Sequence, residues 1–364
     1  MREPQLTLRA VRARGVDAPL KLPLGTSAGT LRSAPLLLID LETEEGVTGR
    51  SYLFCYLNAV IPAIATVLGE VERSVRGDRV APADLWAKLA RRFKLIGVQG
   101  IVGMAMAGFD CACWDALAIA AGKPLVTLLG GAPCRIRAYN SNGLGLMAPE
   151  AAADEGEKLL EGGFRAVKLR LGYPTPAADL AAVRAVRKRL PDSVELMVDY
   201  NQALSLAEAL ERGRALDSEG VAWIEEPIRH DDFRGCAELA RELATPVQIG
   251  ENFSLPEQMA EALAAKACDF VMPDLERIGG VTGWLRAGKM AAERKMPMSS
   301  HLFPETSAHL LAVTPTCHYL EYVDWASAIV EEPLRTVGGE AVIPDRPGTG
   351  LAWDEKAVKR YEIA

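Results

Sequence analysis

The chain of 364 residues is predicted to be an α/β protein, a modified (β/α)₈ barrel of the TIM type with an α+β capping domain. Two patterns predict this class. From about residue 135 onward, short apolar runs alternate with Ala-, Glu- and Arg-rich segments of helical spacing. The first third instead groups strand-like runs ahead of three helical stretches. At about 150 residues per domain, the length allows two or three such units.

The capping domain is expected over residues 1–125. Its strands are predicted near 6–11, 35–41 and 47–54, with Gly46 as the turn between the last two. Its helices are predicted near 59–75, 83–94 and 100–121. The last of these helices is apolar on nearly every face, which is typical of a buried helix.

The barrel is expected over residues 133–325. Its eight strands are predicted at 136–139, 166–171, 196–198, 221–224, 247–249, 270–272, 296–299 and 319–320. A doubly wound sheet is the alternative, but it does not naturally give eight evenly spaced strand–helix units. The Gly- and Pro-rich segment 326–364 lies outside the repeat, and we expect it to pack back on the capping domain.

Composition excludes several classes of function. Hydrophobic residues make up 49% and charged residues 24%, as in a folded globule. A formal charge of −7 disfavours nucleic-acid partners. No run approaches 18 consecutive apolar residues, so no membrane span is expected, and the first residues have no apolar core of a signal peptide. Seven scattered cysteines without a zinc pattern indicate reduced thiols, which favours the cytoplasm.

Three acidic residues follow consecutive strands of the predicted barrel. Asp199, Glu225 and Glu251 are spaced 26 residues apart, about one strand–helix unit. Their carboxylates should therefore meet at the carboxyl ends of the strands, where unpaired they would repel one another. A divalent cation resolves that repulsion, and all-oxygen ligands favour Mg²⁺, with Mn²⁺ as the alternative. One such acid alone would be more simply explained as a helix cap.

Further charged residues are predicted to border the same cavity. Lys168 and Arg170 lie two apart on one strand and so face the same side, although strand-end charges can also simply be solvated. Asp274 and His301 are 27 residues apart at neighbouring strand ends. There Asp274 would orient His301 and raise its basicity, which makes a general base. Glu321 ends the eighth strand and faces the same mouth.

Several motifs in this order resemble the enolase superfamily, and within it the mandelate racemase subgroup (the mandelate racemase/muconate lactonizing enzyme family). The resemblance covers nearly the whole chain. It rests on the stretch 30–51 with SYLFCY (51–56), FRAVKLRLGYP (164–174), MVDYNQ (197–202), WIEEP (223–227), IGEN (249–252), MPD (272–274) with IGGVTGW (278–284), MPMSSHLFPE (296–305) and HYLE (318–321).

The resemblance implies a residue-by-residue assignment. Asp199, Glu225 and Glu251 would hold Mg²⁺, and Lys168 would neutralise the carboxylate of a small hydroxycarboxylate substrate. His301, oriented by Asp274, would be the base. Glu321, carrying a proton, would hydrogen-bond the carboxylate oxygen as an enediolate forms. Of the remaining matched positions, Asn201 and Ser141 would lie near the metal or the substrate. Leu302 would directly follow the base. Four positions would belong to the mobile cap over the substrate: Leu24, Leu31, Phe54 and Tyr56. The resemblance also implies a homo-oligomer, from a dimer to an octamer.

One residue departs from the pattern of the racemases, which carry Lys-x-Lys where this chain has Lys168 and Arg170. Deprotonating Arg170 at pH 7 would cost about 7 kcal/mol, against about 4.6 kcal/mol for an unperturbed lysine. This favours a one-base reaction in which His301 removes the α-proton of a 2-hydroxycarboxylate and a β-hydroxyl leaves, the dehydration of an acid sugar. Arg170 could then bind a polar group or a second carboxylate of the substrate.

Other functions stay open. Racemisation or epimerisation of a mandelate-like acid would need Arg170 as an unusual second base. The apolar side chains of Leu24, Leu31, Phe54 and Leu302 also suit an acid sugar poorly, because its hydroxyl groups need polar partners. A barrel that only binds acidic ligands would need no Asp–His pair. A barrel enzyme with phosphate substrates is a further alternative, but only Gly279-Gly280 in the sequence could indicate a phosphate site.

Overall fold

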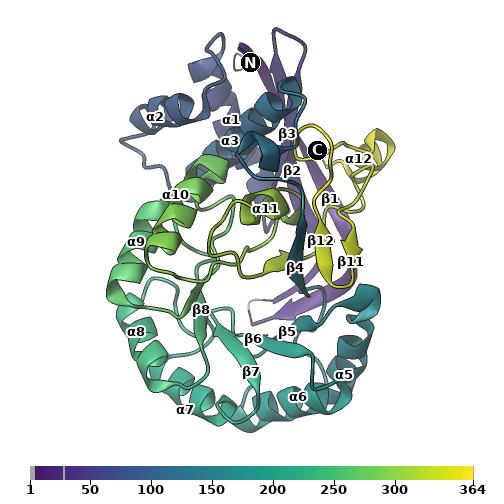
Figure 1. Cartoon of the computed structure of the whole chain (residues 1–364), viewed down its shortest axis with the longest axis vertical. Coiled ribbons are helices and arrows are strands. Elements are labelled where there is room, and N and C mark those ends of the chain that lie inside the picture. The colour runs from purple at the N-terminus through teal and green to yellow at the C-terminus, as the bar shows by residue number, and fades with distance from the viewer. Residues whose placement is uncertain (1–4, 28, 364) are drawn as a thin grey trace.

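The computed structural model describes residues 5–27 and 29–363, so the outer ends of the two predicted terminal segments, at 1–4 and 364, lie outside the described residues. An α+β unit stands above a barrel whose outer helices form a ring around the strands (Figure 1). The predicted fold class is confirmed. The predicted domain boundaries stay predictions.

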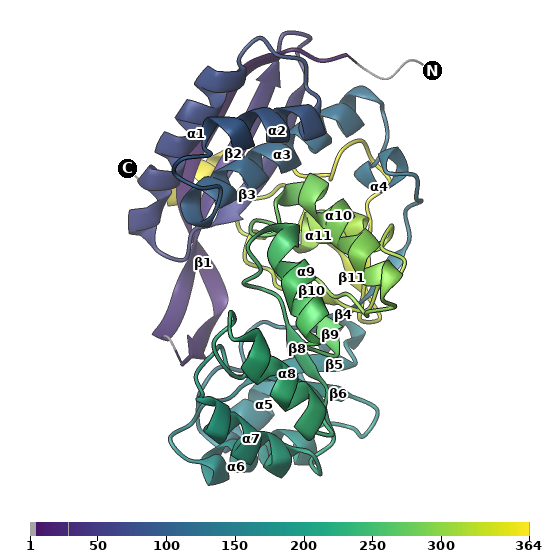
Figure 2. The same ribbon diagram turned by 90° about the vertical axis from the view of Figure 1, so that its left-hand side faces the viewer.

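The upper unit is an antiparallel sheet in the order β1-β2-β3, covered by helices. Its strands are β1 (Leu8–Thr26), β2 (Gly29–Thr43) and β3 (Thr48–Phe54). Its helices are η1 (Asn58–Val60), α1 (Ile61–Val75), α2 (Pro82–Arg92), α3 (Gly100–Ala120) and α4 (Leu125–Leu128). The prediction that the first strand ends at residue 11 is wrong. The paired arms of β1 and β2 continue as a hairpin that reaches down from the sheet toward the barrel (Figure 2).

Helix α3 is the buried core of the capping unit, as predicted. It approaches β3 so closely that a Cβ on Gly49 would lie 2.1 Å from the carbonyl oxygen of Ala112. Among the described residues, α3 is also the one helix long and apolar enough to cross a membrane by length and composition. Of its most apolar window, 78% is buried inside the fold, as in the core helix of a globular protein.

The barrel strands run parallel in the order β4 to β9, and β10 pairs with β4. The strands are β4 (Arg135–Asn140), β5 (Ala166–Arg170), β6 (Glu195–Asp199), β7 (Val221–Glu225), β8 (Val247–Ile249), β9 (Phe270–Val271) and β10 (Leu320–Tyr322). The helices are α5 (Pro149–Lys158), η2 (Glu161–Gly163), α6 (Pro176–Arg189), α7 (Leu206–Leu216), α8 (Phe233–Glu242), α9 (Leu255–Ala265), α10 (Gly280–Glu293) and α11 (Pro304–Leu311).

The seventh predicted strand, 296–299, is not a regular strand. The chain closes the ring there through single bridges from Met298 to Val271 and to Cys317. Pro297 explains the interruption, because it has no N–H to donate to a ladder. Its carbonyl still accepts a hydrogen bond from the N–H of Val271 (3.1 Å).

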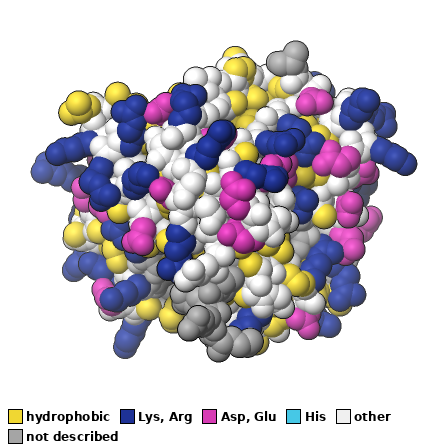
Figure 3. Space-filling model, turned by 90° about the horizontal axis from the view of Figure 1, so that it is seen from above, with side chains coloured by type: hydrophobic (Ala, Val, Ile, Leu, Met, Phe, Trp, Pro, Cys, Tyr) yellow, Lys and Arg dark blue, Asp and Glu magenta, His cyan; other side chains and the backbone are white. Residues whose placement is uncertain are grey.

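The C-terminal segment packs on both units. It contains β11 (Thr336–Val337), β12 (Glu340–Val342) and α12 (Glu355–Tyr361), and β12 pairs with β4. Trp353 Nε1 donates to Asp40 Oδ1 (2.8 Å) in β2. Seen from above, the molecule presents acidic and basic side chains interspersed with apolar ones (Figure 3).

Aromatic packing closes the barrel interior and so limits where a ligand can bind. Trp223 stacks edge-on against Tyr139, with ring centroids 5.5 Å apart, and lies 5.7 Å from Tyr319. All three rings are buried. The charged side chains therefore gather at the carboxyl ends of the strands, beneath the hairpin of β1 and β2.

Candidate active site

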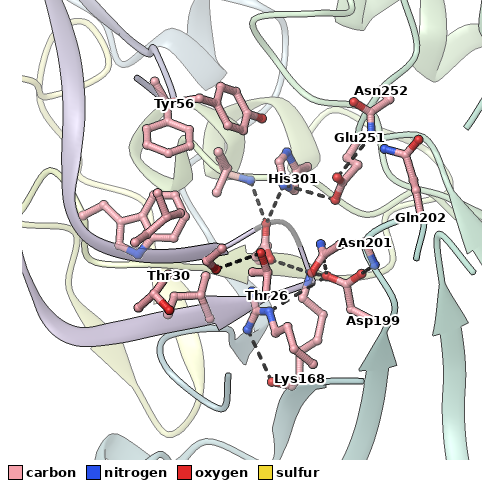
Figure 4. A pocket seen from close by; sticks show the side chains of 18 of the residues that line it. Thr26, Thr30, Tyr56, Lys168, Asp199, Asn201, Gln202, Glu251, Asn252 and His301 are labelled. Atoms are coloured by element: carbon pink, nitrogen blue, oxygen red, sulfur yellow. Dashed lines mark hydrogen bonds and ion pairs between the residues drawn. The ribbon is translucent and has the colours of Figure 1, made fainter. Parts of the chain in front are cut away.

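A cavity of about 430 Å³ lies between the carboxyl ends of the barrel strands and the capping unit (Figure 4). This volume is within the range of small-molecule sites. Twelve of the fifteen predicted site residues line it: Leu24, Leu31, Phe54, Tyr56, Lys168, Arg170, Asp199, Asn201, Glu251, His301, Leu302 and Glu321. The other three, Glu225, Asp274 and Ser141, lie buried behind this lining.

The three predicted metal ligands converge. One carboxylate oxygen from each of Asp199, Glu225 and Glu251 lies within 4.8 Å of the others. Asp199 and Glu225 end β6 and β7, which pair in register, and Glu251 follows β8. Burial raises the pKa of Glu225 to about 8. The positive charge of Lys168 opposes this rise, and the negative charge of Asp199 adds to it. Bringing three largely desolvated carboxylates together is unfavourable without a cation.

Lys168 supplies part of that positive charge. Its ammonium group contacts Glu225 and lies 2.9 Å from Glu321 Oε1 and 3.6 Å from Asp199 Oδ2. Burial would lower the pKa of Lys168, but these carboxylates outweigh it and raise the pKa above its ordinary value. Lys168 is therefore held as a cation among three carboxylates in this structure.

The donor set fits a hard divalent cation. All three convergent ligands are oxygens, the ligand type that Mg²⁺ prefers. Asn201 adds a further oxygen beside them. Its Nδ2 donates to Asp199 Oδ2 (2.9 Å), while its Oδ1 is buried and has no hydrogen-bond partner. A buried acceptor without a donor is costly, so an ion or its water at this point would satisfy it.

His301 lies between the acidic cluster and Asp274, which contacts the side of the ring that faces away from the cluster. Its Nδ1 lies 2.6 Å from Asp274 Oδ2, and its Nε2 lies 3.4 Å from Glu251 Oε2. Burial would lower the pKa of His301, but Glu251, Glu321 and Asp274 raise it to about 10. Neutralisation of Glu251 by a cation would remove the largest of these raising influences. The contact with Asp274 therefore orients the ring so that Nε2 points toward the cavity.

Arg170 is largely committed to the protein. Its Nη1 donates to the carbonyls of Ser141 (2.9 Å) and Gly143 (3.2 Å), and its Nη2 donates to Ser141 Oγ (2.9 Å). Only Nε is buried without a hydrogen-bond partner, 3.9 Å from Asp199 Oδ2. The guanidinium therefore braces the loop after β4.

Glu321 accepts hydrogen bonds from Ser141 Oγ (2.7 Å) and from the N–H of Leu302 (2.9 Å). Burial would raise the pKa of Glu321, but Lys168, His301 and Arg170 outweigh it and hold the pKa below its usual range. Glu321 is thus ionised in this structure, whereas its predicted role as a donor needs the protonated form. That role stays a prediction.

The cap contributes an apolar wall. The rings of Phe54 and Tyr56 have centroids 4.4 Å apart, and Phe54 lies 4.9 Å from Trp325. Leu24 pairs with Leu31 across the hairpin. The wall includes strained backbone, because Tyr56 has a φ of 60° where a side chain disfavours positive values. Such strain concentrates at functional sites.

Sequence reasoning missed several cavity residues. These are Thr26, Thr30, Leu57, Gln202, Asn252, Arg277 and Trp325, with Gly29 at the hairpin tip. Gln202 and Asn252 end two of the motifs quoted above, so their places beside metal-ligand positions were a usable signal. Arg277 lies between two other motifs. Trp325 follows the last strand, and no pattern pointed to it.

The site combines acidic residues at successive strand ends with a His–Asp pair on the next strands, beneath an α+β cap. This combination defines an enzyme of the enolase superfamily. Family models agree. The N-terminal domain of mandelate racemase and muconate lactonizing enzyme matches residues 9–130, and the enolase C-terminal domain-like model matches residues 151–357. The chain belongs to the mandelate racemase/muconate lactonizing enzyme family.

Characterised relatives and solved structures agree with this assignment. The L-talarate/galactarate dehydratase of Salmonella typhimurium is 32% identical over 335 residues, which cover 90% of this chain and 82% of that protein. An enolase from alpha proteobacterium BAL199 with bound magnesium is 44% identical, with a TM-score of 0.97 over 98% of this chain and all of the other. A Bradyrhizobium enolase complexed with magnesium and mandelic acid is 42% identical, with a TM-score of 0.95 over the whole of both chains.

Proposed function

We propose that this chain is a Mg²⁺-dependent acid-sugar dehydratase that removes the α-proton of a 2-hydroxycarboxylate and expels a β-hydroxyl. The observation that carries the proposal is an asymmetry. On one side of the cavity His301 is a base oriented by Asp274 (2.6 Å). On the other side Lys168 is a fixed cation and Arg170 is bound to backbone carbonyls. One base suits elimination, whereas racemisation needs a second.

Asp199, Glu225 and Glu251 would hold Mg²⁺, or Mn²⁺ in its place. When bound, the ion supplies Lewis-acid stabilisation of negative charge on the substrate carboxylate. The fit rests on the convergence of three carboxylates, two of them buried and Glu251 partly exposed, beside the unpartnered oxygen of Asn201.

The chain's own residues would carry the proton and the remaining charge. Lys168 would pair with the substrate carboxylate, and His301 Nε2 would take the α-proton while Asp274 stabilises the imidazolium. Loss of that proton and of the β-hydroxyl, together one water, leaves an enol that becomes a 2-keto acid. Glu321 would hydrogen-bond the substrate carboxylate once it carries a proton.

A second candidate is racemisation of a mandelate-like acid. The aromatic wall of Phe54, Tyr56 and Trp325 favours it, and the Bradyrhizobium enolase binds mandelic acid. Arg170 argues against it, because it would be the second base. A barrel that only binds acids is a third possibility, but it gives no reason for the Asp274–His301 pair.

Proton NMR in D₂O with Mg²⁺ separates these functions. Aldonates, aldarates and aryl 2-hydroxy acids are screened in turn, with the His301→Asn variant as the inactive reference. A 2-keto acid formed by the wild type alone supports dehydration. α-Deuterium in retained substrate together with its inverted isomer overturns it in favour of racemisation. Ligand binding without any exchange overturns both.

We also propose a homo-oligomer in the cytoplasm that acts on a small hydroxycarboxylate. All seven cysteines are free, which supports a reducing compartment. Leu95 and Ile96, exposed by 97% and 73%, form an apolar loop tip that a subunit contact would cover. Light scattering of the purified protein tests the oligomer, and a monomer would contradict it.

A further inference from the structure

We infer that Arg277 is the anchor for a second carboxylate, so that the substrate of this cavity is a dicarboxylate. The inference rests on the proposed function and names its substrate class. Arg277 lines the same cavity as His301 and Lys168 but belongs to neither the acidic cluster nor the His–Asp pair.

The guanidinium of Arg277 is held in place, and among the described residues no carboxylate forms an ion pair with it. Its Cζ lies 5.1 Å from the centroid of the Tyr56 ring, which holds the planar group by a cation–π contact. Its Nε is buried and has no hydrogen-bond partner. A buried donor of a permanently charged group that lacks an acceptor is unfavourable, and a ligand carboxylate would supply that acceptor.

Two acidic side chains lie close enough to influence the charge of Arg277, and each is held by other groups through at least one oxygen. Glu276 Oε1 is buried without a hydrogen-bond partner. Asp274 pairs with His301, and Glu276 Oε2 accepts from the N–H of Phe54 (3.0 Å). Burial would lower the pKa of Arg277, but Tyr56, Asp274 and Glu276 outweigh it and raise the pKa above its ordinary value. In the described part of the chain, neither carboxylate forms an ion pair with the guanidinium. Arg277 therefore keeps its charge available to the cavity.

The other two cations of the cavity are already committed. Lys168 contacts Glu225, Glu321 and Asp199. Arg170 donates to the carbonyls of Ser141 and Gly143. Lys168 stands at the acidic cluster and suits the reacting carboxylate, while Arg277 lies against the cap at Tyr56. A substrate that carries a carboxylate at each end would place one beside Lys168 at the acidic cluster and supply the other as the missing acceptor for Arg277.

The lining near Arg277 also suits a hydroxylated chain. Gln202 and Asn252 line the same cavity, and Thr26 and Thr30 line it from the hairpin (Figure 4). Amide and hydroxyl groups are the partners that sugar hydroxyls need. The apolar wall of Phe54 and Trp325 faces the C–H groups of such a chain. Galactarate, a dicarboxylate in the name of one relative, is thus a sharper probe than a monocarboxylate.

The test compares galactarate with galactonate, which has the same carbon number but one carboxylate. For the Mg²⁺-loaded wild type we expect kcat/KM for galactarate to exceed that for galactonate by about 100-fold, the order that a desolvated charged pair can supply. Arg277→Met should reduce this ratio to below about 5-fold, mainly through KM. Arg277→Lys keeps the charge but not the planar fork, and its ratio should fall between the two.

Two further measurements make the outcome decisive. Arg229→Met removes an exposed arginine that pairs with Asp231 outside the cavity, and it should keep the wild-type ratio. Calorimetric titration of both acids into His301→Asn, with and without Arg277→Met, reports binding without turnover. Thermal unfolding shows whether the Arg277→Met protein is folded; if it is not, Arg277→Lys alone decides.

The possible failures are distinguishable. Equal turnover and equal binding of the two acids by the wild type would overturn the role of Arg277 and leave the proposed dehydration intact. Preferential binding of galactarate without α-proton exchange would support Arg277 and refute the dehydration. Strong binding of mandelate with no binding of galactarate would overturn the dicarboxylate.

Discussion

His301 and Asp274 form a buried pair in which Nδ1 of the ring lies 2.6 Å from Oδ2 of the carboxylate. The second oxygen of Asp274 accepts from the backbone N–H groups of Glu276 (2.7 Å) and Arg277 (3.2 Å). These contacts hold the carboxylate of Asp274 in one orientation. It fixes the ring with a proton on Nδ1 and leaves Nε2 to exchange protons with a ligand.

Replacement of either member of this pair should reduce catalysis by different amounts. His301→Asn removes the base and should abolish α-proton exchange. Asp274→Asn leaves the ring but can present an N–H to Nδ1, which favours the wrong tautomer, so kcat should fall by about 10²- to 10⁴-fold. NMR exchange rates in D₂O measure both. His230→Asn, which changes a histidine outside the cavity, is the control, and full exchange by His301→Asn would refute the assignment.

Metal removal should both stop turnover and lower stability. A ligand that binds only the folded chain stabilises it by about 2.7 kcal/mol at 100 times its dissociation constant. Mg²⁺ should therefore raise the thermal midpoint of the wild type, and EDTA should reverse the rise and the activity. Glu251→Gln should lose the Mg²⁺-dependent rise, while Glu257→Gln, on the exposed side of α9, should keep it. Turnover that persists in EDTA would refute the proposal that the reaction depends on a metal ion.

The sequence predicts much of this site because a barrel repeats at a nearly constant length. Asp199, Glu225 and Glu251 each follow a strand at a spacing of 26 residues, so parallel pairing alone brings them to one end. The same logic placed Asp274 beside His301. These predictions need only the order of strands and not the details of side-chain packing.

Other features depend on contacts that sequence patterns do not encode. The arms of β1 and β2 extend beyond the predicted strand through a register shift between Pro19 and Leu24, so strict alternation is lost there. The residues around Arg277 in the sequence form no pattern that indicates a binding site, and only the fold places its side chain at the cavity. The commitment of Arg170 to two carbonyls likewise depends on how the loop after β4 turns.

A buried hydrogen bond between the two units should contribute measurably to stability. Tyr52 in β3 donates to Glu305 Oε2 (2.6 Å) at the start of α11, and both side chains are buried. Tyr52→Phe removes the donor and leaves the carboxyl group unsatisfied, which should cost about 1–3 kcal/mol. Urea unfolding gives the difference. Tyr361→Phe, at the partly exposed end of α12, is the control, and equal effects of the two changes would contradict the prediction.

His309 should make stability depend on pH between about 4 and 6.5. The ring lies buried in α11, where Nδ1 accepts from the N–H of Val126 (3.2 Å) and Nε2 lies 3.2 Å from the carbonyl of Thr349. Burial lowers the pKa of His309 from 6.5 to about 4, although the Thr349 carbonyl opposes this. Because the unfolded chain binds this proton first, the stabilisation is complete above pH 6.5 and is lost as the pH falls toward 4.

The His309→Gln variant isolates the effect of His309 on the pH dependence of stability, because glutamine does not titrate. His318, whose pKa is also lowered to about 4, contributes equally to both proteins and cancels. Between pH 7.5 and pH 5.0, the free energy of unfolding of the wild type should fall by about 2 kcal/mol more than that of His309→Gln. Urea unfolding at the two pH values measures both proteins. A difference between them that does not change with pH would mean that the pKa of His309 is the same in the folded and the unfolded chain, which would contradict the prediction.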